Sequence, residues 1–310
     1  MTASVPGPAP ADAPLGDVLV VGDLMVDVVA SHRDPLVEGS DTPARIVLAG
    51  GGSAANTACW LASLGEPPRL LSACGDDAFG TMALRDLEAA GVRSIGPVLE
   101  GASTGVCLVL VDGTGERTML PDRGANDRLP MSVVVEALDP MPSWVHLSGY
   151  AILHEGSRNA GRAVLSAGIA SGAVVSVDAA STAPIRAVGA EAFLQWIDGA
   201  SLVLANDDEV EALGGVAAVL RHVDAVAVKH GAAGATWTDG HQHIRAEALT
   251  VDVVDSAGAG DAFAAGWIAA VRCGDDETAA LAAAVRAGAT AVASAGARPA
   301  PRTSPSSPRP

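Results

Sequence analysis

The sequence has few basic residues. Over 310 residues it carries 19 Lys+Arg against 36 Asp+Glu, a formal net charge of −17. No surplus of positive charge is present to displace counterions from a phosphate backbone, so nucleic acid and anionic membranes are disfavoured as main partners. A nucleotide is not excluded, because a few backbone N–H groups at the start of a helix can hold a phosphate.

Cysteine and long apolar runs are also scarce. The four cysteines, Cys59, Cys74, Cys107 and Cys273, are far apart and form no C-x-x-C pair. We expect them to be small core residues of a reduced protein, with no disulfide and no zinc. No apolar run approaches the roughly 18 residues of a membrane helix, and residues 1–14 lack a signal core. The sequence therefore predicts a cytoplasmic protein without a membrane partner.

Apolar residues make up 49% of the chain, enough for a large core. The Pro-rich ends, 1–14 and 299–310, are predicted to be disordered tails around one domain at 15–298. Short apolar runs alternate there with helical stretches, which predicts an α/β fold with a mostly parallel sheet flanked by helices. The predicted strands lie at 17–22, 69–74, 144–147, 174–178, 202–204 and 225–228, and the predicted helices include 54–64 and 79–90.

Two segments interrupt this alternation. Residues 31–48 and 104–120, the second with turn signals at Asp112-Gly113 and Gly115, are predicted to form short antiparallel strands. Together they would make a small β-sheet beside the main domain. Ligands of open α/β folds bind outside the carboxyl ends of the strands, so this sheet is expected to act as a lid.

The most informative motif is Asp255-Ser-Ala-Gly-Ala-Gly-Asp261, between a strand-like run at 249–254 and a helical stretch at 262–271. A strand, a glycine turn and a helix predict an anion site. The N–H groups of Gly258, Ala259 and Gly260 would point at a phosphate from the positive end of the helix dipole.

Asp261 then falls in the first turn of the helix. A carboxylate beside a phosphoryl-binding turn can act as general base toward a substrate hydroxyl. The alternative is that Asp261 only caps the helix, with the glycines forming a tight turn. Spacing alone does not decide between the two.

A second motif, Gly50-Gly-Gly-Ser-Ala-Ala-Asn-Thr-Ala58, stands at the start of another predicted helix. Gly51 and Gly52 permit close approach of a ligand, and Asn56 offers both a donor and an acceptor to a polyol. A hinge with an asparagine bonded to its own backbone is the alternative.

Together and in this order, the two motifs resemble the paired signatures of the ribokinase (PfkB) family of carbohydrate kinases. The resemblance covers nearly the whole chain between the tails. It implies a Rossmann-like (ribokinase-like) domain with a small β-sheet lid, and ATP with Mg²⁺ as phosphoryl source. The acceptor would be a primary hydroxyl of a sugar, sugar acid or nucleoside. It implies Asp261 as catalytic base and Gly258, Ala259 and Gly260 as anion hole.

The resemblance also implies a nucleotide side. Asn206-Asp-Asp-Glu209 is similar to the family's N-x-x-E element, in which Asn206 and Glu209 arrange magnesium through water. Spacing alone fits equally a helix-terminal charge at Glu209. Lys229-His-Gly-Ala-Ala-Gly234 resembles the ATP loop, with Gly231 and Gly234 beside the nucleotide. A solvated surface lysine is the alternative for Lys229.

By the same resemblance, Asp255 and Ser256 are expected to bind an activating monovalent cation such as K⁺. On the acceptor side, Asp27 occupies the position of the family's sugar-contacting aspartate. Ser148 occupies the position where ribose-specific members carry a glutamate. Neither Ser148 nor Met25 nor Ser53 is the residue that ribose-specific members carry. A site that lacks those polar groups disfavours ribose.

Arginines near the second lid segment add one hypothesis. Arg123 in the substrate cleft would bind a carboxylate bidentately and favour a sugar acid such as 2-keto-3-deoxygluconate. Alternatively, Arg123 is solvated or pairs with Asp122 or Asp127. The role of Arg117 stays open.

The sequence thus predicts an ATP-dependent phosphotransferase acting on a small sugar-like acceptor, with a homodimer through the lid as a further expectation. Two alternatives are a catalytically weak metabolite-sensing protein on the same fold and a nucleoside or pseudouridine kinase. A nicotinamide-dependent oxidoreductase is disfavoured, because Gly22 opens no G-x-G-x-x-G turn.

Overall fold

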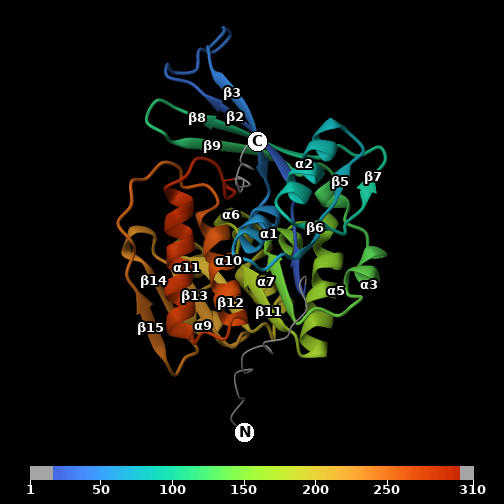
Figure 1. Cartoon of the computed structure of the whole chain (residues 1–310), viewed down its shortest axis with the longest axis vertical. Helices are drawn as coiled ribbons and strands as arrows, with labels where there is room; N and C mark the ends of the chain where they lie inside the picture. Colours follow the sequence, from blue (N-terminus) through green and yellow to red (C-terminus); the bar gives the residue numbers. More distant parts are fainter. Residues whose placement is uncertain (1–16, 301–310) are drawn as a thin grey trace, which may run out of the picture.

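The computed structural model describes residues 17–300, so residues 1–14 and 301–310 of the predicted tails lie outside the described residues. A nine-stranded sheet with the order β15-β14-β13-β12-β11-β10-β1-β4-β6 forms the centre (Figure 1). The strands from β13 to β6 run parallel, and β14 and β15 are antiparallel. The predicted mostly parallel α/β sheet is confirmed. Its strands are β1 (Val18–Val21), β4 (Arg69–Leu71), β6 (Arg93–Ser94), β10 (Trp144–Ser148), β11 (Val174–Asp178), β12 (Leu202–Asn206), β13 (Val226–Lys229), β14 (Ala235–Thr238) and β15 (His243–Ala246).

Helices cover both faces of this sheet because the strands are apolar on both sides. In β1, Val18 and Val20 face one core, and Leu19 and Val21 face the other. The first core is covered by α1 (Ser53–Ser63), α2 (Ala78–Ala89), α10 (Ala259–Arg272) and α11 (Glu277–Val292). The second is covered by α3 (Val133–Ala137), α4 (Tyr150–Leu153), α5 (Glu155–Ser171), α6 (Thr182–Val188), α7 (Ala190–Trp196), α8 (Asp207–Ala212) and α9 (Val216–Val219).

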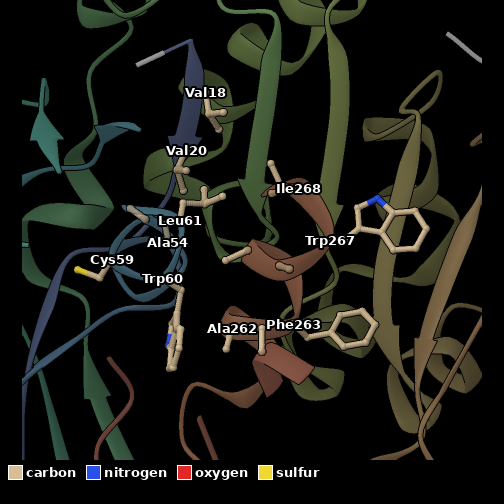
Figure 2. Close-up of a cluster of buried hydrophobic side chains, with 14 of the residues drawn as sticks. Val18, Val20, Ala54, Cys59, Trp60, Leu61, Ala262, Phe263, Trp267 and Ile268 are labelled. Carbon is tan, nitrogen blue, oxygen red and sulfur yellow. The ribbon is translucent and has the colours of Figure 1, made fainter. Parts of the chain in front are cut away.

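The first core fixes α1 beside α10. Figure 2 shows side chains of β1, α1 and α10 gathered there, among them Leu61 of α1 near Val20 of β1. Trp267 of α10 also stacks on Trp237 of β14, with ring centroids 6.3 Å apart. Because the two helices lie in contact, their first turns meet at one edge of the sheet.

A four-stranded sheet with the order β3-β2-β8-β9, called here the lid sheet, projects from the body (Figure 1). The hairpins β2-β3 and β8-β9 are antiparallel, as expected, although the first of these four strands ends at Ser31, where the predicted segment 31–48 begins. The strands β2 and β8 pair in parallel. Both strands lead away from the body in the same direction, which makes their pairing parallel. The strands are β2 (Met25–Ser31), β3 (Arg45–Gly51), β8 (Gly105–Val111) and β9 (Arg117–Asp122), and a separate short pair joins β5 (Cys74–Gly75) and β7 (Val98–Leu99).

The prediction of a strand at 249–254 was wrong, because this segment pairs with no strand among the described residues. Leu249, Val251 and Val253 are 49%, 37% and 73% exposed, so the apolar alternation faces solvent rather than a core. The backbone N–H groups of Val254 and Asp255 instead donate to Val292 O at the end of α11.

Three of the cysteines, Cys59, Cys74 and Cys107, are buried as expected. Cys273 is exposed, because it is the C-cap residue of α10, where the helix leaves the core. Within residues 17–300, the helices are too short or too polar to span a bilayer.

Candidate active site

Four neighbouring parallel strands end in a polar residue at the same edge of the sheet. They are β10 at Ser148, β11 at Asp178, β12 at Asn206 and β13 at Lys229. The register places Ser148 beside Asp178 and Asn206 beside Lys229. The carboxyl edge of a parallel sheet is where open α/β folds bind ligands.

Asp261 reaches this edge from the first turn of α10. Its Oδ1 accepts a hydrogen bond from Ser53 Oγ at 2.8 Å, and its Oδ2 accepts one from Asn56 Nδ2 at 3.0 Å. Both donors belong to the first turn of α1. The N-cap residue of α10 is Gly258, at φ 72°, and no side chain caps this helix. Asp261 therefore does not act as the helix cap.

The environment of Asp261 suits a proton acceptor. Burial raises its pKa to about 6, while the hydrogen bonds from Asn56 and Ser53 oppose that rise. The negative charge of Asp178 also raises the pKa, and Lys229 lowers it. A carboxylate with this pKa is ionised at neutral pH and is a stronger base than an ordinary aspartate.

Lys229 is the only lysine of the chain and lies beside the glycine turn. Its Nζ donates to Asp178 Oδ2 at 2.8 Å, and a Cβ on Gly260 would stand 3.2 Å from Nζ. Burial lowers the pKa of Lys229, but Asp178 and Glu209 raise it more, so its net shift is upward. Sequence reasoning missed Asp178, although its place at the end of a predicted strand was a signal.

Asn206 and Glu209 form a capping box at the start of α8. Asn206 Oδ1 accepts from Glu209 N at 2.8 Å, and the Asn206 backbone and side-chain N–H groups donate to the Glu209 carboxylate at 2.8 and 2.9 Å. Burial raises the pKa of Glu209, and Asp178 adds to the rise. The helix-terminal role proposed as the alternative is thus present, and it does not remove the carboxylate from the sheet edge.

A magnesium site at Asn206 and Glu209 has to be tested against these contacts. Among residues 17–300, no group of three or more His, Cys, Asp or Glu side chains could enclose a metal ion. Magnesium usually keeps several waters and uses substrate phosphates as ligands. Each Glu209 oxygen accepts one hydrogen bond and keeps a lone pair, which fits a cation held through water.

The two glycines of the predicted ATP loop differ. Gly231 is exposed, and a Cβ there would meet open space. Gly234, at φ 88°, is buried, and a Cβ there would overlap Ala246 O. Gly231 therefore borders a space open to a ligand, whereas Gly234 is required by packing between β14 and the segment after β15.

The glycines before α1 make room for Asp27. A Cβ on Gly51 would overlap the Asp27 carboxylate. Gly52 has a φ of 90°, and a Cβ there would overlap the backbone oxygen of Asp23. Burial raises the pKa of Asp27, while the positive charges of Arg298 and Arg117 lower it. Asp27 thus lies in β2, with its carboxylate packed against Gly51 at the end of β3, close to the start of α1.

Arg298 is a residue that sequence reasoning missed. Its Nε donates to Asn56 Oδ1 at 3.1 Å, and its Nη2 donates to Gly51 O at 2.8 Å. A Cβ on Gly50 would overlap the guanidinium, so the triple glycine accommodates this side chain too. The only signal in the sequence was an arginine just before the region interpreted as a tail.

Two predicted substrate residues are not brought to the Asp261 carboxylate. Arg123 is 7% exposed, donates to both Asp23 oxygens at 2.8 and 2.6 Å, and pairs with Asp127. Its guanidinium is thus engaged by protein carboxylates, of which the alternative for this arginine had named Asp127 but not Asp23. Ser148 is fully buried in β10, and its Oγ has no hydrogen-bond partner among the described residues.

The expected monovalent-cation site does not fit the contacts of Asp255. Arg117, from the lid sheet, pairs with Asp255 Oδ1, which also accepts from Ala257 N at 2.7 Å. Oδ2 accepts from Gly296 N at 2.9 Å. Burial raises the pKa of Asp255, but these donors outweigh it and hold the pKa below its usual value. A guanidinium already neutralises this carboxylate, and Ser256 is exposed.

Comparison with known proteins finds kinases that cover nearly the whole chain, including the site. The family described as pfkB family carbohydrate kinase matches residues 16–303. An ATP-dependent ribose-1-phosphate kinase of Halopiger xanaduensis is 35% identical over 295 residues, covering 92% of this chain and 94% of that protein. An adenosine kinase from Sinorhizobium meliloti superposes with a TM-score of 0.83 at 25% identity, covering 93% and 97% of the two chains. A putative ribokinase II from E. coli, in complex with ATP and Mg²⁺, gives 0.81 at 25% identity, covering 91% and 94%.

Proposed function

The chain belongs to the PfkB family of carbohydrate kinases, and from this premise we propose that it transfers the γ-phosphoryl group of ATP to a primary hydroxyl, with Asp261 as general base. One observation carries the proposal. The Asp261 carboxylate, with a pKa raised to about 6, is fixed by Ser53 and Asn56 at the N-terminus of α10. The glycine turn and Lys229 lie next to it.

In the proposed reaction, the acceptor oxygen attacks the γ-phosphorus and its proton passes to Asp261. The bond between the γ-phosphorus and the β,γ-bridging oxygen breaks, and ADP leaves. The N–H groups of Gly258, Ala259 and Gly260 would stabilise the negative charge that develops on the transferred group. Lys229, kept protonated by Asp178, would add a positive charge on the same side.

ATP and magnesium as cosubstrates are supported by the E. coli protein described with both. Magnesium would neutralise charge on the ATP phosphates when bound. In this chain Asn206 and Glu209 would orient the waters around it, and the open space at Gly231 would admit the nucleotide.

For the acceptor we propose a ribosyl unit with a substituent at C1. Two similar proteins are named for ribose 1-phosphate and adenosine, which share that unit. Free ribose is disfavoured, because Met25 is buried and apolar and Ser53 is engaged with Asp261. Asp27 of β2, with its carboxylate beside Gly51, would accept hydrogen bonds from the sugar hydroxyls.

An ADP-release assay with magnesium and ATP tests the proposal over ribose 1-phosphate, adenosine, ribose and a keto-deoxy sugar acid. We expect acceptor-dependent ADP release, greatest for the C1-substituted ribosyl compounds. Binding of these compounds without ADP release would instead favour a metabolite-sensing protein.

Replacement of the base tests the mechanism. Asp261→Asn should lower kcat by about 10²–10⁴-fold, the usual contribution of a positioned base, with ATP affinity nearly unchanged. Asp252→Asn, at an exposed aspartate of the preceding segment, is the matched control and should keep full activity. An unchanged kcat in Asp261→Asn would rule out the mechanism.

A further inference from the structure

Arg298 is a half-buried cation whose charge lowers the pKa of Asp27, but it forms no close ion pair with a carboxylate among residues 17–300. Arg117 and Arg123, the other arginines near this edge, are each paired with aspartate. The contacts of Arg298 to Asn56 and Gly51 use the single N–H of Nε and one of the two N–H groups of Nη2. A guanidinium has five N–H donors, so most of its donors are left for a ligand.

The backbone segment that carries Arg298 is fixed by contacts on three sides. Gly296 N donates to Asp255 Oδ2 at 2.9 Å, and Trp60 Nε1 donates to Ala297 O at 3.0 Å. Gly258, at φ 72°, packs so closely that a Cβ there would overlap Ala297 O. Arg298 is therefore presented by a rigid connection to the starts of α1 and α10, and not by a loose tail.

The N-terminus of α1 lies beside the guanidinium, because Arg298 bonds to Gly51 O directly before that helix. The helix has 11 residues, its N-cap Gly52 supplies no side-chain cap, and its first turn holds no acidic residue. The Asp261 carboxylate lies beside this turn but accepts from the side chains of Ser53 and Asn56, so no carboxylate among the described residues caps the backbone N–H groups at this positive end of the helix dipole. A helix N-terminus together with a guanidinium fork favours a phosphate.

We propose that Arg298 and the N-terminus of α1 bind a phosphate group carried by the acceptor. This assignment rests on the proposed function, and it makes the C1 substituent of the ribosyl unit anionic. Only the amide of Asn56 separates the Asp261 carboxylate from the Arg298 guanidinium. The reacting hydroxyl and the phosphate would therefore lie at opposite ends of one small sugar, with Asp27 contacting the hydroxyls between them.

The test compares two acceptors in one variant. In Arg298→Gln, kcat/KM for ribose 1-phosphate should fall by about 10–100-fold, mainly through KM, the size expected for lost hydrogen bonds to a charged group. With adenosine, whose C1 substituent is neutral, the loss should be much smaller, and the KM for ATP should not change. Arg298→Lys should recover part of the loss. Arg286→Gln, at an exposed arginine of α11, is the charge-matched control.

The outcomes separate the two proposals. Equal losses for both acceptors would mean that Arg298 only positions Asn56, and the phosphate site would be overturned. Turnover of neutral acceptors alone by the unmodified protein would overturn it too, while leaving the kinase proposal intact. If no acceptor releases ADP, the proposed function fails. Calorimetric titration of ribose 1-phosphate into the protein and into Arg298→Gln then still decides the site, because binding that does not weaken in the variant refutes it.

Discussion

Ionisation of the Asp261 carboxyl group should control how kcat/KM depends on pH. Burial raises its pKa to about 6, and it must be ionised to accept a proton. We therefore expect kcat/KM to be level above that pH and to fall about tenfold per pH unit below it. Ser53→Ala removes a donor that stabilises the ionised form, so the acid limb should move to higher pH by up to about one unit.

Steady-state ADP release between pH 5 and 8 measures both profiles. Ser63→Ala, at the other end of α1, removes a serine whose Oγ donates only to Trp60 O at 2.7 Å, and it should leave the acid limb in place. A downward shift in Ser53→Ala, or none, would contradict the assignment of this donor.

Which site residues could be predicted from the sequence depended mainly on whether they lie inside a recognisable motif. Asp261 and Asn56 were predicted as site residues because each lies inside a recognisable motif. Ser53 was interpreted only as the loss of a ribose-binding group, and Arg298 was not considered. Their contacts with Asp261 and Asn56 join residues 208 and 242 positions apart. Such pairs are set by the packing of α1 against α10 and against the segment after α11 rather than by local pattern.

At the scale of elements, helix starts and strand ends carry the site. Strand positions were predictable, because buried parallel strands are continuous apolar runs, as at 202–204. The exposed run at 249–254 shows a strand-like alternation of apolar residues but has no partner strand among the described residues, and for this reason its prediction failed. The polar residues at the strand ends gain their meaning only from register, which pairs Asn206 with Lys229.

The capping box of α8 allows a test of stability against nucleotide binding. Asn206→Ala should cost about 1 kcal/mol of stability, as loss of an N-cap does, and lower Tm by roughly 2–4 °C. It should also raise the KM for MgATP severalfold, because Glu209 loses the Asn206 Nδ2 donor that orients it and keeps only the donor from the backbone N–H of residue 206.

Asp276→Ala is the matched control, since Asp276 caps α11 through Ala279 N at 2.8 Å. It should lower Tm by a similar amount without changing the KM for MgATP. If both variants show the same KM, Asn206 and Glu209 serve only the helix.

At the scale of the whole molecule, the lid sheet is tied to the body by two arginines. Arg117 of β9 pairs with Asp255 before α10, and Arg298 after α11 bonds to Gly51 at the end of β3. Both connections meet within the segments that begin α1 and α10. The position of the lid sheet is therefore coupled to the first turns that hold Asp261.

The pair between Arg117 and Asp255 also predicts how the enzyme responds to monovalent cations. Because a guanidinium and two backbone N–H groups already engage Asp255, turnover should be the same in potassium, sodium or choline chloride at equal ionic strength. Arg117→Ala frees the carboxylate, so its turnover should fall in choline and recover in potassium. Arg45→Ala, at an exposed arginine of β3, should keep both the rate and the indifference to potassium. Strong potassium activation of the unmodified protein would show that Arg117 leaves Asp255 during turnover, so that the lid sheet is not held by this pair when the reaction occurs.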